Sequence, residues 1–135
     1  HRERIVARIS EQVPNIPPNV RVLYVPVGSG VTLAGVLEGR RKYGGDYSIV
    51  GLQPFGYDRV GTVTGICEGM VHEYDYEFRK GNYPYAKLHE RHVGSIELDM
   101  IYESKAFDMV EWKEDNTECY WIIGNTNKLR KGYNG

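Results

Sequence analysis

The chain has 135 residues, of which 17 are basic and 18 acidic, so its formal net charge is −1. This length suits one domain with a single hydrophobic core, and the scattered charges argue against a nucleic-acid-binding surface. No apolar run is long enough to span a membrane, and the distant Cys67 and Cys119 provide no metal-ligand spacing. We therefore expect a cytoplasmic protein with one domain over residues 1–127 and a flexible tail over 128–135.

The first half of the chain alternates helix and strand patterns. Apolar residues at helical spacing predict an amphipathic helix over Glu3–Val13, which Pro14 ends. The nearly continuous apolar run Val20–Val27 is typical of a strand buried on both faces. A second helix is predicted to end at Gly44-Gly45, before another buried strand at Tyr47–Gln53. This order predicts a three-layer α/β fold in which a mostly parallel sheet is flanked by helices.

The second half of the chain is less regular. Gly56–Met70 fits either a loop or a glycine-interrupted helix, and the sequence does not decide between them. Val71–Phe78 is predicted as an extended segment, and Lys80–Tyr85 has the composition of a turn. We predict a helix over Ile101–Trp112 and a third buried strand over Cys119–Ile123.

A glycine turn joins the first predicted strand to the second predicted helix. Such a turn directs backbone N–H groups toward one point, where the helix dipole also favours negative charge. It can therefore bind a phosphate without a basic side chain. Ligands of parallel sheets bind beyond the carboxyl ends of the strands, so we predict a phosphate-bearing small molecule at this turn. The residues of the turn are Gly28, Ser29, Gly30, Val31 and Thr32.

Other classes of ligand have less support. The Rossmann fingerprint needs a glycine three residues after its second one, but the next glycine here is Gly35, and Gln53-Pro54 stands where an acidic residue would bind the ribose. No Gly-Lys-Ser/Thr triplet indicates a Walker loop. His72, His89 and His92 complete no metal-ligand spacing, so we predict no metal site. A lone Gly-x-Gly also fits a tight turn without a ligand.

Two motifs give the chain a more specific resemblance. The run Val25–Gly35 resembles the phosphate loop of fold-type II pyridoxal-phosphate enzymes, in particular the aminocyclopropanecarboxylate deaminase and D-cysteine desulfhydrase branch, where the turn is Gly-Ser-Gly-Gly-Thr. Tyr85-Ala86-Lys87 and then Leu98–Phe107 resemble the later motif of that branch, Asp-Pro-x-Tyr followed by Glu or Thr, Gly and Lys. The two motifs occur in the right order. The resemblance covers Val20–Thr126 and corresponds to the C-terminal part of such an enzyme.

The resemblance implies roles for individual residues. The turn Gly28–Thr32 would hold the phosphate of pyridoxal phosphate. Glu103 would face the pyridine nitrogen, and Tyr102 would lie beside the substrate as an acid or base. Asn125 and Thr126 would lie near the pyridine ring.

The sequence also departs from the pattern of these enzymes. Val31 replaces a loop glycine, which requires a negative φ at that position, and Ser104 replaces the glycine of the later motif. The Schiff-base lysine of the family belongs to an N-terminal portion that has no counterpart in these residues. The run Asn127–Lys131 echoes the context of that lysine but lies at the wrong end of the fold.

Three functions therefore remain open. The first is a domain related to these enzymes that is not catalytic by itself and serves as a binding or assembly module, including as a homo-oligomer. The second is part of an active deaminase or desulfhydrase of small amino acids, completed by a complementary N-terminal segment that supplies the lysine. The third is an unrelated phosphate-binding α/β module.

Overall fold

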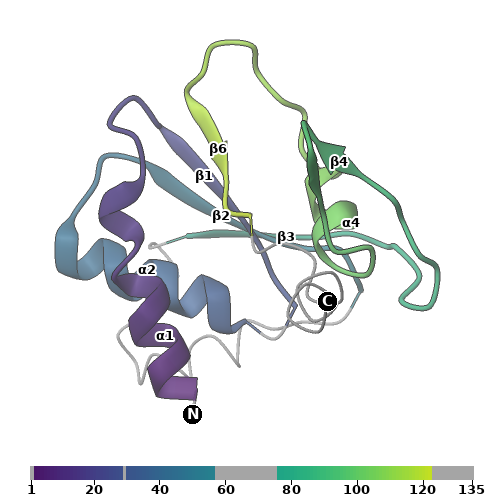
Figure 1. Ribbon diagram of the computed structural model, residues 1–135, viewed down its shortest axis with the longest axis horizontal. Helices are drawn as coiled ribbons and strands as arrows, with labels where there is room; N and C mark the ends of the chain where they lie inside the picture. Colours follow the sequence, from purple (N-terminus) through teal and green to yellow (C-terminus); the bar gives the residue numbers. More distant parts are fainter. Residues whose placement is uncertain (1, 29, 57–75, 123–135) are drawn as a thin grey trace.

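Four parallel strands form the sheet of the computed structural model, which describes residues 2–28, 30–56 and 76–122 (Figure 1). Their order is β3-β2-β1-β6. At the centre, Leu23 of β1 stands opposite Ile49 of β2 on one side and Cys119 of β6 on the other. Because all the pairs are parallel, the carboxyl ends of the strands meet at one edge. The strands are β1 at Val22–Pro26, β2 at Ser48–Gln53, β3 at Glu77–Lys80 and β6 at Glu118–Tyr120.

Helices cover both faces of this sheet. On one face lie α1 (Arg2–Ser10), the 3₁₀ turn η1 (Val13–Asn15) and α2 (Val31–Tyr43), while the short α4 (Glu103–Phe107) lies on the other (Figure 1). Alternate residues of the strands supply two hydrophobic cores. Leu23 belongs to the core under α1 and α2, whereas its neighbour Tyr24 belongs to the core under α4. The predicted three-layer α/β fold is therefore confirmed.

The elements predicted for the first half of the chain are confirmed to within a few residues. The first helix ends at Ser10, slightly before the predicted limit, and η1 follows it around Pro14. The second helix ends at Tyr43, where Gly44 adopts a positive φ of 79°. None of the helices in the described ranges is long and apolar enough to cross a membrane.

The helix predicted over Ile101–Trp112 is wrong in extent, because α4 contains only the five residues Glu103–Phe107. Its start is delayed because the Asp99 side chain accepts hydrogen bonds from backbone N–H groups in the preceding turn. Its end is early because Met109 N and Val110 N bond to carbonyls only three residues back, which tightens the last turn.

Two predicted extended segments also need correction. The strand expected at Cys119–Ile123 is β6 at Glu118–Tyr120, and its residues are half-buried rather than buried. The extended segment expected at Val71–Phe78 is β3, which begins at Glu77 and continues to Lys80; residues 71–75 lie outside the described residues. The undecided stretch 56–70 is described only at Gly56, and the expected tail 128–135 is also outside the described residues.

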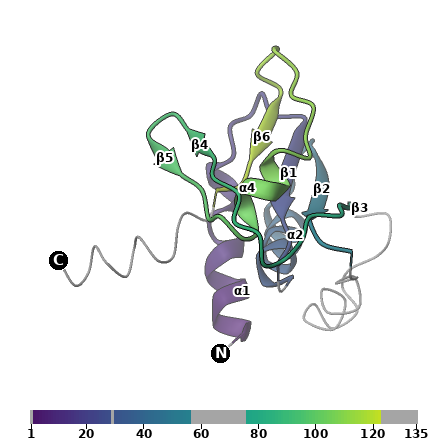
Figure 2. The same ribbon diagram turned by 90° about the vertical axis from the view of Figure 1, so that its right-hand side faces the viewer.

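A small hairpin was not predicted. Strands β4 (His92–Val93) and β5 (Ile96–Glu97) pair antiparallel around Gly94, whose φ is 61°. Figure 2 shows this hairpin extending away from the main sheet. The two-residue turn Gly94-Ser95 between extended residues is a sequence signal that could have indicated it.

Candidate functional site

The glycine turn lies at the carboxyl edge of the sheet, between β1 and α2. Gly30 is the N-cap residue of α2 and has a φ of 94°, a left-handed conformation that favours glycine. Its carbonyl accepts a hydrogen bond of 3.0 Å from Ala34 N. Among the described non-glycine residues only Asn116 has a positive φ, so Val31 meets the requirement set by replacing a loop glycine.

The charges of α2 favour an anion at this turn. The helix has 13 residues, its first turn contains no acidic side chain, and its last turn contains Arg40, Arg41 and Lys42. The basic residues stabilise the negative end of the helix dipole, and no acidic side chain in the first turn neutralises the positive end. Val31 and Thr32, both half-buried, form the start of the helix beside Gly30. This end of α2 can therefore bind a phosphate or carboxylate group.

Tyr102 from the later motif lies against the glycine turn. A Cβ atom placed on Gly28 would be 3.1 Å from both Cδ1 and Cε1 of the Tyr102 ring. This distance is shorter than most van der Waals contacts, so the absence of a side chain at Gly28 lets the ring approach the backbone. The structure therefore brings together the two segments that the resemblance assigns to one site.

Two further aromatic rings surround Tyr102. The ring centroid of Phe55 is 5.3 Å from that of Tyr102 and 5.2 Å from that of Tyr85, and the Tyr85 and Tyr102 centroids are 6.0 Å apart. Phe55 is buried, whereas Tyr85 is 54% exposed. Tilted and edge-on pairs at these distances are favourable. We call Phe55, Tyr85 and Tyr102 the aromatic cluster; it forms a wall of the site that reaches from the core to the surface.

The backbone of Tyr102 is held by Asp99. One carboxylate oxygen, Oδ2, accepts hydrogen bonds from Ile101 N at 3.2 Å and Tyr102 N at 2.7 Å. In return, Glu103 Oε1 accepts a bond of 3.3 Å from Asp99 N. This reciprocal arrangement is analogous to a capping box, in which side chains satisfy the N–H groups at the start of a helix. It fixes the turn that presents Tyr102.

Glu103, which the resemblance places against a pyridine nitrogen, is 1% exposed. Its backbone carbonyl accepts a hydrogen bond of 2.8 Å from the Tyr120 hydroxyl. Burial raises the pKa of Tyr120, and the carboxylates of Glu103, Asp108 and Asp99 raise it further, so this phenol stays a donor. The Glu103 carboxylate therefore lies in a buried network that also contains the turn of Tyr102.

Lys105 packs against the buried side of the aromatic cluster and is 1% exposed. Its ammonium group donates to Pro84 O at 2.8 Å and Tyr85 O at 3.3 Å, and Nζ is 5.0 Å from the centroid of the Phe55 ring. Burial lowers the pKa of Lys105, while the Asp99 carboxylate opposes that shift. No role was predicted for this lysine, because a lysine followed by apolar residues in a short helix gives no sign of burial.

Gln53 is a second residue for which no role was predicted from the sequence, although it ends a predicted strand. Its side chain is completely buried, and Nε2 donates to Phe55 O at 2.9 Å, but Oε1 has no hydrogen-bond partner within the described part of the chain. Two residues earlier, a Cβ on Gly51 would lie 2.8 Å from Leu33 Cδ2 in the first turn of α2. Alternate strand residues share a face, so Gln53 lies on the side of the sheet where α2 begins.

Several predicted residues cannot be placed. Ser29 of the turn and Asn125 and Thr126 at the end of the chain lie outside the described residues, as does His72. His89 is described and contacts Asp108, with 2.5 Å between Nε2 and Oδ2. Within the ranges that the structure describes, no group of three or more His, Cys, Asp and Glu side chains could hold a metal ion.

The comparisons with known proteins concern the fold. No family model matches the sequence, and a search of curated proteins finds no match. One similar solved structure is described as a crystal structure analysis of the ACC deaminase homologue, with 24% sequence identity and a TM-score of 0.63. The match covers 94% of this chain and 48% of that chain, so this chain spans about half the length of that protein. The likeness shows that the two proteins share a fold over this part.

Proposed function

We propose that this chain is a pyridoxal-phosphate-binding domain of the fold-type II kind, in which the turn Gly28–Thr32 holds the phosphate. The observation that carries the proposal is the contact of the Tyr102 ring with Gly28. The resemblance had assigned the turn to the phosphate and Tyr102 to the surroundings of the substrate, which requires the two to be neighbours. The shared fold with an ACC deaminase homologue supports the same assignment.

The residues present suit the two ends of such a cofactor. The start of α2 provides N–H groups and a positive dipole end without an acidic side chain, which suits a doubly charged phosphate. The aromatic cluster provides an apolar wall beside it, which suits a planar ring. When bound, pyridoxal phosphate supplies an electron sink for reactions of amino acids. Tyr102 would border the substrate, and Glu103 would supply a carboxylate to the ring nitrogen.

We further propose that the chain binds the cofactor without a covalent bond and does not catalyse the reaction by itself. The lysines of this chain do not match the family's motif around the Schiff-base lysine. Lys105, the buried lysine beside the aromatic cluster, uses its ammonium group to bind two backbone carbonyls. A nucleophilic amine needs a free lone pair, which this arrangement does not offer. The proposed role is thus binding or assembly.

A charge placed at the start of α2 tests the phosphate site. In Thr32→Asp a carboxylate joins the first turn of the helix, where it favours helix stability but repels a phosphate. We expect the variant to be at least as stable as the wild type and to bind pyridoxal phosphate at least about tenfold more weakly, which corresponds to about 1.4 kcal/mol. Ser48→Asp is the matched control, because Ser48 is exposed at the start of β2, on the edge of the sheet opposite to the glycine turn.

Binding is measured by absorbance and fluorescence titration with pyridoxal phosphate, pyridoxal and inorganic phosphate. The proposal expects phosphate to compete with pyridoxal phosphate and pyridoxal to bind more weakly, because pyridoxal lacks the phosphate group. Equal affinity of wild type, T32D and S48D, or equal affinity for pyridoxal and its phosphate, would contradict a phosphate site at this turn. Labelling of one lysine after borohydride reduction would show that a Schiff base forms and would contradict purely non-covalent binding.

One observation favours a second candidate function, in which the chain forms part of an active deaminase or desulfhydrase. The chain spans about half the length of the ACC deaminase homologue, and a separate segment carrying a lysine would complete such a site. Adding the unmatched half of the ACC deaminase homologue as a separate polypeptide and assaying release of ammonia or sulfide from small amino acids tests this candidate. The product should appear only with both polypeptides together, and its absence from the mixture would exclude the candidate.

A further inference from the structure

We infer that Lys105 is a positioning residue of the proposed site, whose buried ammonium group fixes the segment 83–85 and thereby holds Tyr102 against Gly28. The inference rests on the proposed function for its ligand. The contacts that support it belong to this chain and involve no cofactor. They join α4, the segment 83–85 and the carboxyl end of β2.

The ammonium group of Lys105 is buried among polar and aromatic groups. Lys105 is 1% exposed, and its Nζ donates to the carbonyls of Pro84 and Tyr85 at 2.8 and 3.3 Å. The face of the Phe55 ring lies 5.0 Å from Nζ and contributes a cation–π interaction. A buried cation is costly unless polar groups surround it, so the two carbonyls are required for Lys105 to occupy this place. The dependence is mutual, because the carbonyls lose a charged donor without Lys105.

Lys105 and the carbonyls of Pro84 and Tyr85, which we call the clamp, are connected to the ligand site through the Tyr85 ring. The segment that Lys105 binds carries Tyr85, whose ring packs on both Phe55 and Tyr102. Tyr85 is more than half exposed, so the surrounding core does little to fix it. Tyr102 in turn lies against Gly28 at the glycine turn. Lys105 thus fixes the positions of the Phe55 and Tyr85 rings, and these two rings in turn fix the position of the Tyr102 ring beside the glycine turn.

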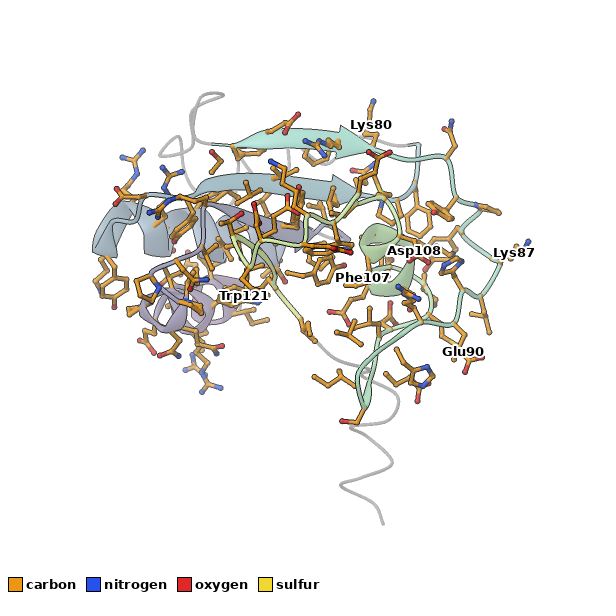
Figure 3. All side chains as sticks on the ribbon, turned by 90° about the horizontal axis from the view of Figure 1, so that it is seen from above. Lys80, Lys87, Glu90, Phe107, Asp108 and Trp121 are labelled. Carbon is orange, nitrogen blue, oxygen red and sulfur yellow. The ribbon has the colours of Figure 1, made fainter. Side chains whose placement is uncertain are left out.

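Another lysine of the same region provides a contrast. Lys87 is only two residues beyond Tyr85 but is exposed, and Figure 3 shows it on the outer side of the segment. Substituting methionine for either lysine removes one positive charge and keeps an unbranched side chain of similar length. Lys87→Met is therefore a matched control for Lys105→Met. A general effect of charge would appear in both variants, whereas an effect of the clamp would appear in K105M alone.

The clamp itself is tested without any ligand, by hydrogen exchange of the full chain. Backbone bonds anchor the segment 83–85 and the residues that follow it, among them Tyr83 N to Pro54 O at 2.9 Å and His89 N to Met100 O at 3.0 Å. We expect the Tyr83 and His89 amides to exchange at least about tenfold faster in K105M than in wild type or K87M, with amides of β1 and β2 changed much less. Unchanged exchange at Tyr83 and His89, or an equal increase throughout the sheet, would overturn the inference.

A double-mutant cycle then separates positioning from a merely structural role. We expect K105M to weaken binding of pyridoxal phosphate about tenfold in the wild-type background and less than about twofold in the Tyr102→Leu background, because the clamp acts through Tyr102. Equal weakening in both backgrounds would overturn the inference. If K105M does not fold, Tyr85→Ala replaces it in the cycle, since Tyr85 is largely exposed and connects the clamp to Tyr102.

The two proposals fail in different ways. If the wild type binds neither pyridoxal phosphate nor phosphate, the proposed function is wrong and Lys105 is not a positioning residue for that ligand, whatever the exchange data show. If the wild type binds the cofactor and T32D does not, while K105M affects neither exchange nor binding, the proposed function stands and the role of Lys105 is refuted.

Discussion

A buried tyrosine in the centre of the sheet should make the stability of the fold depend on alkaline pH. Tyr24 on β1 is 5% exposed, and its hydroxyl donates a hydrogen bond of 2.7 Å to Glu118 Oε2. Burial, together with the hydrogen bond and the negative charge of Glu118, raises the pKa of Tyr24 to about 12. The unfolded chain has the ordinary value near 10.

The sign and size of the effect follow from these two pKa values. Below about pH 10 the hydroxyl of Tyr24 is neutral in both states and its full contribution to stability is present. Between about pH 10 and 12 the unfolded state loses the proton and the folded state keeps it, so stability falls as the pH rises. The loss is about 1.4 kcal/mol at pH 11 and approaches about 2.7 kcal/mol above pH 12.

Urea denaturation of the wild type and Tyr24→Phe between about pH 8 and 11 measures this effect. The difference in the free energy of unfolding between the two proteins should shrink by about 1.4 kcal/mol over that range, because the phenylalanine variant has no proton to lose. Tyr43→Phe is the control, since Tyr43 is 45% exposed. A difference that stays constant with pH for Y24F, or that changes equally for Y43F, would refute the reasoning.

Substitutions at three further positions test contacts around the site and the helices. Asp99→Ala removes the acceptor of the turn before α4 and should lower the free energy of unfolding by about 1–2 kcal/mol, with partial recovery in Asp99→Asn. Gly39→Ala would place a Cβ 2.3 Å from Val13 Cγ2, so thermal melting should show a loss of about 1–3 kcal/mol; unchanged melting would contradict this close packing of helices. Tyr120→Phe leaves the Glu103 carbonyl without its hydroxyl donor and should cost about 1–2 kcal/mol in urea denaturation, whereas a neutral effect would show that water replaces the donor.

The first half of the fold could be predicted because its signals are local. The run Val20–Val27 is apolar except for Arg21, as expected for a strand between two layers of helices, and β1 indeed lies in the middle of the sheet. Gly30 and Gly44 bracket α2, and both adopt the positive φ that makes glycine informative at a helix boundary. In each case the residue type and the backbone requirement lie at the same position in the chain.

The second half could not be predicted to the same extent, because its structure depends on distant partners. The helix predicted at Ile101–Trp112 had suitable apolar spacing, but Asp99 and the tightened turn after Phe107 confine it to five residues. Lys105 has the side chain of a surface residue, and only the carbonyls of the segment 83–85 make its burial favourable. A sequence pattern contains no information about such a partner twenty residues away.

The order of the strands explains why the two motifs meet. Since β6 pairs in parallel with β1, the chain must return to the amino end of the sheet before Glu118, and residues 108–117 make this return. The segment that carries Tyr102 therefore precedes the return and lies near the carboxyl edge, where β1 ends at Pro26 and the glycine turn begins. Helix α2 starts at that edge and covers one face of the sheet, whereas α4 packs on the other face. Residues from both helical layers therefore lie next to the turn at Gly28.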